Sequence, residues 1–321
     1  MNFSNNNQNT ATSILMIKPV DFQYNQETAT DNEFMNKTIE NTKANKEALK
    51  EFDKAVKIIQ NSGVNVLVFD KNEADNDLKE ISMPDAVFPN NWISTDTDNA
   101  ILLYQMMAKN RNYEKHQFRY IAEMLSKQFV IDSVVNFSYK DQILEGTGSL
   151  LIDRVKRRAY CSRSKRAEQD IFEHWCRTRN YEGILFDGFA KSGTPIYHTN
   201  VLLSIGEKFA VFCADTIKDE QQRKFVVEKL KEDRELILIS QKQVEEYFCG
   251  NILEVANQKG EKQIFMSQRA YDGFTKEQIE TLSKYGKLNP VPLYNIEEIG
   301  GGSMRCMMAE IFLQPKKQES Q

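Results

Sequence analysis

Residues 92–104 read WISTDTDNAILLY, two β-rich runs that flank a polar turn. Branched and aromatic side chains favour strands, and the Asp, Thr and Asn residues between them favour a turn, so this segment predicts a hairpin. Similar pairs of runs recur at 149–152 with 159–161, at 201–204 with 209–213 and at 252–255 with 263–266. We expect the run at 306–313 to pair with residues 13–17.

The spacing of these pairs indicates an internal repeat. Their first runs begin near residues 92, 149, 201, 252 and 305, at intervals of 57, 52, 51 and 53 residues. Helical patterns lie between the pairs, and Thr275 with Gln278 predicts a capping box at the start of one helix. Further β-rich runs at 64–69 and 235–239 follow helices. We predict an α/β fold of five units, each a hairpin, a helix and another strand, arranged around a pseudo-symmetry axis with the helices outside. Loops from every unit then meet at one central site.

The composition is that of an ordinary globular protein. The chain has 321 residues, of which 40% are apolar and 27% charged, and its formal net charge is -4. This length can bury the core of one large domain or of two. The charges are scattered and form no basic stripe that would follow a nucleic acid backbone, so we expect no nucleic acid partner.

The terminal segments and the cysteines bear on the compartment. Residues 1–12 are rich in Asn and lack the layout of a signal peptide, so we interpret them as a disordered tail, with a second tail at 314–321. No apolar run approaches the roughly 20 residues that span a bilayer, so we expect no membrane association. Five cysteines without a CxxC pair favour free thiols in a reducing compartment. The sequence therefore predicts a cytoplasmic protein.

One cysteine has a setting that suits chemistry. Cys306 ends the segment at 300–306, which reads GGGSMRC. Glycines allow the backbone to approach a ligand and to adopt positive φ, and the guanidinium of Arg305 would favour the thiolate that a nucleophile requires. A glycine-rich turn before a buried core cysteine explains the same letters. This segment alone leaves both interpretations open.

Three other segments place polar residues at equivalent points of successive repeats. His198, in YHTN at 197–200, stands at the mouth of the third hairpin. Glu145, in LEGTGS at 144–149, enters the second hairpin and suits either a turn acceptor or an orienter of a catalytic base. Asp85, Asn90 and Asn91, in PDAVFPNNW at 84–92, reach the same rim in the first repeat. This recurrence favours one catalytic site over several unrelated turns.

Together these four segments resemble the pentein superfamily of guanidine-modifying enzymes, which includes arginine deiminases, dimethylarginine dimethylaminohydrolases and glycine amidinotransferases. The resemblance is strongest to bacterial citrulline-utilisation hydrolases and covers residues 14–312. It implies a five-bladed α/β propeller of ββαβ repeats, and one catalytic domain over residues 13–313. It also implies Cys306 as the nucleophile, His198 as the general acid and base, and Glu145 as the residue that orients the imidazole and favours its charged form.

Two departures from the family pattern bear on the substrate. Arginine-directed penteins grip the guanidinium with carboxylates at the places where this chain has Asn91 and Asn200. An amide both donates and accepts hydrogen bonds, so it suits a neutral ureido group better than a buried cation. The sequence therefore favours hydrolysis of L-citrulline to ornithine, ammonia and carbon dioxide through an S-carbamoyl enzyme. Asp85 keeps open a guanidine hydrolase like arginine deiminase or dimethylarginine hydrolase, and a non-catalytic amino-acid-binding propeller is a third interpretation.

An amino-acid substrate also needs a partner for its carboxylate. Arg166 resembles the arginine that binds this group in arginine deiminases, and Arg163 competes with it for the role. A solvated basic run explains both arginines equally well. Asn90 and Asn251 are further candidates for substrate contact. We expect no cofactor and no metal, because no cluster of His, Asp and Glu has ligand spacing. The expected partner is citrulline or an arginine derivative, and a homodimer is compatible with the sequence.

Overall fold

The computed structural model describes residues 9–36, 41–138 and 142–317. Residues 1–8 and 318–321, most of the two predicted tails, lie outside the described residues. Residues 9–12, which we also assigned to the tail, lie against two hairpins. Asn9 is buried and donates to Asp153 Oδ1 at 3.0 Å, and the Ala11 carbonyl accepts from the amide of Ala256 at 2.9 Å.

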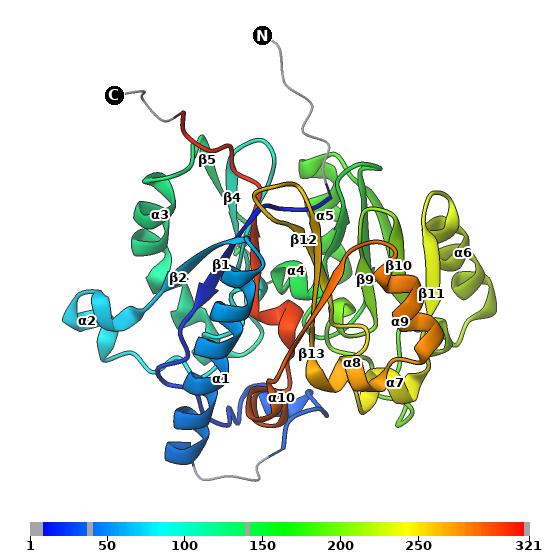
Figure 1. The fold of residues 1–321 in the computed structure, drawn as a ribbon, viewed down its shortest axis with the longest axis horizontal. Coiled ribbons are helices and arrows are strands. Elements are labelled where there is room, and N and C mark those ends of the chain that lie inside the picture. The colour runs from blue at the N-terminus through cyan, green and yellow to red at the C-terminus, as the bar shows by residue number, and fades with distance from the viewer. Residues whose placement is uncertain (1–8, 37–40, 139–141, 318–321) are drawn as a thin grey trace.

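The strands form five separate three-stranded sheets (Figure 1). In each sheet an antiparallel hairpin is followed by a third strand that runs parallel to the second. The strands are β1 (Ser13–Ile17), β2 (Asn65–Phe69), β3 (Ile93–Thr95), β4 (Ala100–Leu103), β5 (Ser133–Asn136), β6 (Leu151–Asp153), β7 (Arg158–Ser162), β8 (Glu182–Phe186), β9 (Leu203–Ile205), β10 (Phe209–Phe212), β11 (Glu235–Leu238), β12 (Leu253–Ala256), β13 (Lys262–Ser267), β14 (Lys287–Val291) and β15 (Ala309–Ile311).

This topology confirms the predicted hairpins and repeats. All four predicted hairpins form, and β15 pairs with β1 in the register Ser13 to Ile311, so the last strand completes the first sheet. The strands nearest the centre, such as β3, β4 and β15, are wholly buried, whereas third strands such as β5 and β11 are largely exposed. The chain thus has five repeated small α/β units.

Helices connect the second and third strands of each sheet or lie between sheets. They are α1 (Asn41–Asn61), α2 (Asn76–Lys79), α3 (Phe118–Ser126), α4 (Gly146–Ser149), α5 (Gln169–Arg179), α6 (Glu220–Lys231), α7 (Gln241–Glu245), α8 (Gln268–Gly273), α9 (Lys276–Ser283) and α10 (Tyr294–Gly300). Helix α9 begins with the predicted capping box, in which Thr275 Oγ1 accepts from the amide of Gln278 and Gln278 Oε1 accepts from that of Thr275. None of the helices in the described ranges is long and apolar enough to cross a membrane.

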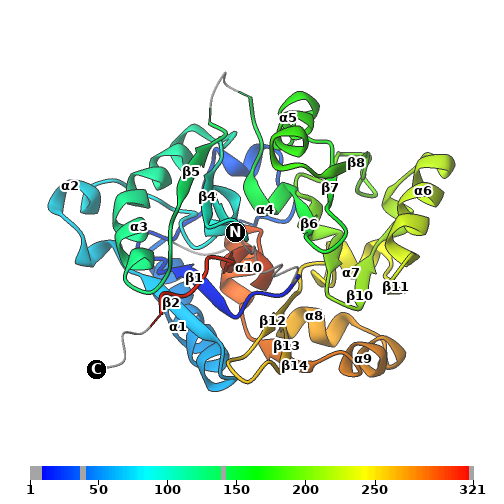
Figure 2. The same ribbon diagram turned by 90° about the horizontal axis from the view of Figure 1, so that it is seen from above.

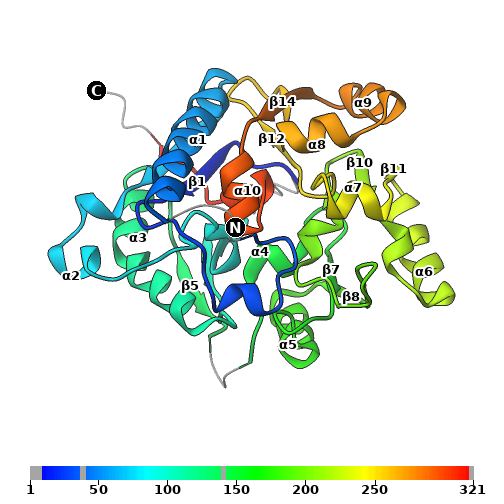
Figure 3. The ribbon, with the colours of Figure 1, turned by 90° about the horizontal axis from the view of Figure 1, so that it is seen from below.

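The sheets are set around a centre that holds α10, with α1, α3, α5, α6 and α9 at the periphery (Figures 2 and 3). Short helical turns lie just before four of the first hairpin strands: η3 (Pro89–Asn91), α4, η5 (Thr199–Val201) and η7 (Met304–Met307). Side chains and carbonyls link these turns in sequence, from Asn90 through Thr147, Asn200 and Asn251 to Arg305. The links bring one loop from each repeat to a common place.

Candidate active site

A small cavity, of about 20 Å³, lies where these turns meet. Its lining includes three of the predicted catalytic and acidic groups, Cys306, His198 and Asp85, and none of them is more than 3% exposed. The other lining residues are Thr28, Asn32, Phe88, Asn91, Arg111, Arg166, Tyr197, Gly300, Gly301 and Gly302. The tertiary structure thus brings together residues that are more than 200 positions apart in sequence.

Cys306 sits in η7 with its sulfur between two amide side chains. Asn251 Nδ2 lies 3.3 Å and Asn200 Nδ2 3.5 Å from Cys306 Sγ, so both amides can donate to a thiolate. We expected Arg305 to provide this support, and that expectation is wrong. The guanidinium of Arg305 is buried against Glu310 Oε2 at 2.8 Å and the Met308 carbonyl at 2.9 Å, because a buried cation requires its own counter-charge.

His198 and Glu145 form a buried pair. His198 Nε2 lies 2.7 Å from Glu145 Oε2, and the other oxygen, Oε1, accepts from the amide of Met107 at 2.9 Å. Burial opposes the charge of Glu145, but the nearby Arg166 and the bond from His198 outweigh it and lower the pKa of Glu145 to about 2. The carboxylate is therefore ionised, and Nε2 carries the hydrogen that it accepts.

The imidazole itself is held neutral, contrary to our expectation of a favoured imidazolium. Burial lowers the pKa of His198 below its ordinary value of 6.5, and although Glu145 raises it, Arg166 and Arg111 add to the lowering. A neutral ring bonded through Nε2 leaves Nδ1 as a proton acceptor. His198 can therefore act as a base in the cavity that Cys306 also lines.

Asp85 presents one satisfied oxygen and one without a partner. Its Oδ2 accepts from Asn25 Nδ2 at 2.7 Å and from Thr28 Oγ1 at 3.0 Å, whereas Oδ1 is buried and has no hydrogen bond. Burial raises the pKa of Asp85, although Arg111 and the two donors oppose this shift. A buried oxygen without a partner on a cavity wall is a place where a ligand N–H or O–H can bind.

The amide of Asn91 is oriented by an ion pair that sequence reasoning missed. Arg111, in η4 (Lys109–Gln117), donates from Nη1 to Asn91 Oδ1 at 2.7 Å and from Nε to Glu114 Oε1 at 2.7 Å. Asn91 Nδ2 donates to Asn90 Oδ1 at 2.8 Å, which leaves its second N–H for a ligand. Asn90 itself does not line the cavity. An Arg and a Glu three residues apart in the sequence are the signal that could have found this pair.

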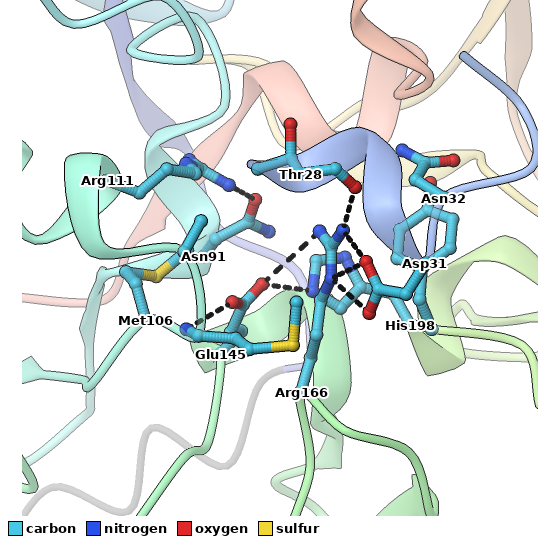
Figure 4. A network of polar contacts seen from close by, with 12 residues as sticks. Thr28, Asp31, Asn32, Asn91, Met106, Arg111, Glu145, Arg166 and His198 are labelled. Atoms are coloured by element: carbon cyan, nitrogen blue, oxygen red, sulfur yellow. Dashed lines mark hydrogen bonds and ion pairs between the residues drawn. The ribbon is translucent and has the colours of Figure 1, made fainter. Parts of the chain in front are cut away.

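Arg166 enters the cavity and Arg163 does not. Arg163 is partly exposed and pairs with Asp187, whereas Arg166 is 3% exposed and meets Asp31 and the Thr28 carbonyl. Figure 4 shows the Arg166 side chain between Asp31 on one side and Glu145 on the other. This placement favours Arg166 over Arg163 as the partner of a substrate carboxylate. Sequence reasoning missed Asp31, which no motif marks.

The glycines of the predicted motifs are required by close contacts. A Cβ at Gly148 would lie 2.5 Å from Asn91 Nδ2 and 2.9 Å from the His198 ring, and Gly301 has a φ of +64°. The Gly301 carbonyl accepts from the hydroxyl of Tyr197.

Asn251, which we placed at the amino-acid end of the substrate, instead contacts the sulfur of Cys306. Within the described ranges, no three His, Cys, Asp or Glu side chains cluster as metal ligands do.

The family model for eukaryotic N,N dimethylarginine dimethylhydrolase matches residues 18–313. The chain belongs to this family. It is therefore a pentein, a member of the superfamily of guanidino-group-modifying enzymes, as the four sequence motifs predicted. The search of curated proteins gave no match.

Solved pentein structures share the fold of this family member. The apo structure of ArgZ, an arginine dihydrolase from the ornithine-ammonia cycle in cyanobacteria, is 17% identical with a TM-score of 0.71, over 94% of this chain and 41% of that one. Unliganded AgrE is 16% identical with a TM-score of 0.72, over 96% of this chain and 40% of AgrE.

A third solved structure is covered along its whole length by the match. Dimethylarginine dimethylaminohydrolase, as an adduct with S-methyl-L-thiocitrulline, is 13% identical with a TM-score of 0.64, over 94% of this chain and all of that one. The present chain therefore spans less than half of ArgZ and AgrE, but 98% of the ArgZ N-terminal domain bound to substrate. At these identities the likeness demonstrates a shared fold.

Proposed function

We propose that the protein is a cysteine-dependent hydrolase that cleaves the ureido group of L-citrulline to ornithine, ammonia and carbon dioxide. The amides of Asn91 and Asn200 carry the proposal, and the charge of the cavity is compatible with it. Among the described residues that line the cavity, Arg111 and Arg166 are the cations and Asp85 is the one acid. Glu145 is engaged by His198 and Arg166, and Glu114 by Arg111. Arg111 is paired with Glu114, and Arg166 with Asp31 and Glu145, so Asp85 alone among the described lining residues is left to balance a buried guanidinium, whereas a neutral ureido group needs no counter-charge.

The asparagines support the same substrate. Asn91 has one free N–H beside the reacting end of the cavity, and Asn200 holds its amide near Cys306 Sγ. Amide N–H groups can donate to a urea oxygen, and that oxygen gains negative charge when sulfur adds to the carbon. Asp85 Oδ1 can accept from a urea N–H. Each of these contacts suits a group that both donates and accepts.

The reaction proceeds in two covalent steps. His198 takes the Cys306 proton, and the sulfur adds to the ureido carbon. The protonated His198 then gives its proton to the δ-nitrogen, the bond between that nitrogen and the carbon breaks, and ornithine leaves. In the second step His198 activates a water that attacks the S-carbamoyl carbon, which restores the thiol and releases carbamate. Carbamate decomposes to ammonia and carbon dioxide, so one water is consumed in all.

The test is product analysis on a panel of citrulline, arginine, dimethylarginine and agmatine. We expect ornithine from citrulline in the native protein and none from a Cys306→Ala variant. Mass spectrometry of the acid-quenched enzyme should show Cys306 increased by one carbamoyl group. Absence of ornithine release from citrulline, or full activity in Cys306→Ala, would contradict the proposal.

A second candidate is hydrolysis of a guanidine such as arginine or dimethylarginine, for which the family is named. The unpartnered Oδ1 of Asp85 favours it, because a carboxylate oxygen suits a cationic N–H donor. Asn91→Asp and Asn200→Asp separate the two candidates. If citrulline is the substrate, the added charges should shift binding toward arginine. If arginine is already the substrate, its turnover should stay equal or fall.

We also propose that the five sheets are the blades of a pentein propeller. Their shared strand order and their arrangement around α10 support this description. The expected cytoplasmic location has the support of five free cysteines, all buried and none in a disulfide within the described residues.

A further inference from the structure

The segment at 25–36, which follows β1, contributes Thr28 and Asn32 to the lining of the cavity and is held by polar contacts with the cavity walls. Asn25 and Thr28 donate to Asp85, and Asn32 donates to the Gly301 carbonyl. Asp85 and Gly301, which these residues contact, also line the cavity. A substrate that enters must therefore exchange contacts with this segment, which we call the cover segment.

The strongest of these contacts is the ion pair between Asp31 and Arg166. The two carboxylate oxygens of Asp31 accept from Arg166 Nε at 3.2 and 3.1 Å, and Oδ1 also accepts from Nη2. This edge of the guanidinium, Nε with Nη2, is the fork that binds carboxylates side by side. Nη1 points the other way and lies 3.7 Å from Glu145 Oε2. In the free protein Asp31 thus occupies the fork that a substrate carboxylate would need.

We propose that Asp31 is a specificity-determining residue that selects free α-amino acids: when the substrate binds, its α-carboxylate takes the Arg166 fork and its α-ammonium takes Asp31. The proposal rests on the proposed function, because it assumes that the ureido or guanidino end points to Cys306. Substrate binding here makes and breaks no covalent bond. The ion pair between Asp31 and Arg166 is replaced by two ion pairs with the substrate.

The charges explain why a zwitterion is selected. A ligand with both head groups leaves neither Asp31 nor Arg166 without a counter-charge. A ligand with the carboxylate alone displaces Asp31 from Arg166 and leaves two carboxylates beside one guanidinium. A ligand with the ammonium alone competes with Arg166 for Asp31. Because both residues are at most 10% exposed as side chains, water compensates these losses poorly.

Binding to the Cys306→Ala variant tests the proposal without turnover. Calorimetry would compare citrulline with 5-ureidopentanoate, which lacks the ammonium, and with (4-aminobutyl)urea, which lacks the carboxylate. We expect Asp31→Asn to lower the affinity for citrulline by about tenfold or more, since the α-ammonium of the ligand loses a charged partner. The same substitution should raise the affinity for 5-ureidopentanoate several-fold, because the fork of Arg166 is then free. Asp31→Glu, which keeps the charge, should retain the preference for citrulline.

Glu33→Gln is the matched control. Glu33 lies in the same cover segment, but it is exposed and bonds Ser192 and Thr194 outside the cavity. Its substitution should change neither ligand's affinity. Thermal melts of each variant would confirm that the fold is kept.

The opposite effects of Asp31→Asn on the two ligands are the decisive result. If Asp31→Asn changes the affinities for citrulline and 5-ureidopentanoate by the same factor and in the same direction, Asp31 does not select the head group and the inference is wrong. The set is repeated with arginine, 5-guanidinopentanoate and agmatine. Opposite effects confined to the guanidino set would support the inference and contradict citrulline as substrate. Failure of both sets to bind would overturn the proposed function and this inference together.

Discussion

Glu145 Oε2 lies 2.7 Å from His198 Nε2 in a pair that is at most 2% exposed. The bond joins two repeats whose residues are 53 positions apart, and it determines which ring nitrogen is left to exchange a proton. Because the carboxylate is ionised and the ring neutral, the free protein holds a base in the cavity that Cys306 also lines.

This arrangement predicts the acid limb of the pH profile. Burial lowers the pKa of His198, so kcat/KM should fall on acidification with a midpoint below 6.5. Glu145→Gln removes the carboxylate that raises this pKa, so the midpoint should move lower still while kcat falls on the order of 10³-fold, since the ring loses its orienting partner. Steady-state rates between pH 4.5 and 8 check both statements. A native midpoint above 6.5 would contradict the neutral imidazole.

Asn251→Ala should slow the reaction of Cys306 with iodoacetamide by about tenfold, because the sulfur loses the amide at 3.3 Å. It should also cost about 1–2 kcal/mol in the free energy of unfolding, since Asn251 Oδ1 accepts from the amide of Arg305 at 3.0 Å. Asn289→Ala is the control, because Asn289 is also buried but bonds Gln263 away from the cavity. Mass spectrometry of labelled peptides measures the rates. Equal slowing in both variants would show a general effect of destabilisation.

Gly148→Ala should abolish most of the activity. The added Cβ would stand 2.9 Å from the His198 ring and 2.5 Å from Asn91 Nδ2, so one of these site residues must move. The expected loss in kcat/KM is on the order of 10²-fold, as for small displacements of catalytic groups. Gly193→Ala serves for comparison, since its φ of +89° makes the change costly although no atom lies within 4 Å. If Gly148→Ala keeps native rates, His198 is not confined as we describe.

The buried Glu297 should make the free energy of unfolding depend on pH. Burial raises the pKa of Glu297 to about 7, against the opposing effects of Ser267, Ser303 and Arg269, and Glu51 adds to the rise. The folded protein therefore holds a proton that the unfolded chain has lost between pH 4.5 and 7, so stability declines as pH rises through this window. Glu297→Gln should remove this part of the decline, up to about 3 kcal/mol. Urea unfolding at pH 5, 6, 7 and 8 measures it, and a pH-independent difference from native would refute the shift.

The sequence predicted the repeat well because local patterns encode it. Alternating runs and turn residues marked the hairpins, and the box at Thr275 marked the start of α9. The motifs also indicated that Cys306, His198 and Glu145 belong to one site, whereas Arg166 and Arg163 were left as competing candidates. Their contacts could not be predicted in the same way. Arg305 directly precedes Cys306 in sequence, yet its guanidinium bonds Glu310, because a short helical turn directs adjacent side chains to different sides.

The sequence by itself thus determined the family, the five α/β units and the residues that can do chemistry. Only the tertiary structure decided their partners: Arg111 with Asn91, Asp31 with Arg166, and Asn251 with Cys306. It also decided that His198 is neutral, which its motif did not predict. The physical reason is that pKa shifts and ion pairs depend on burial and on charges a few ångströms away, and these neighbours come from loops of different repeats.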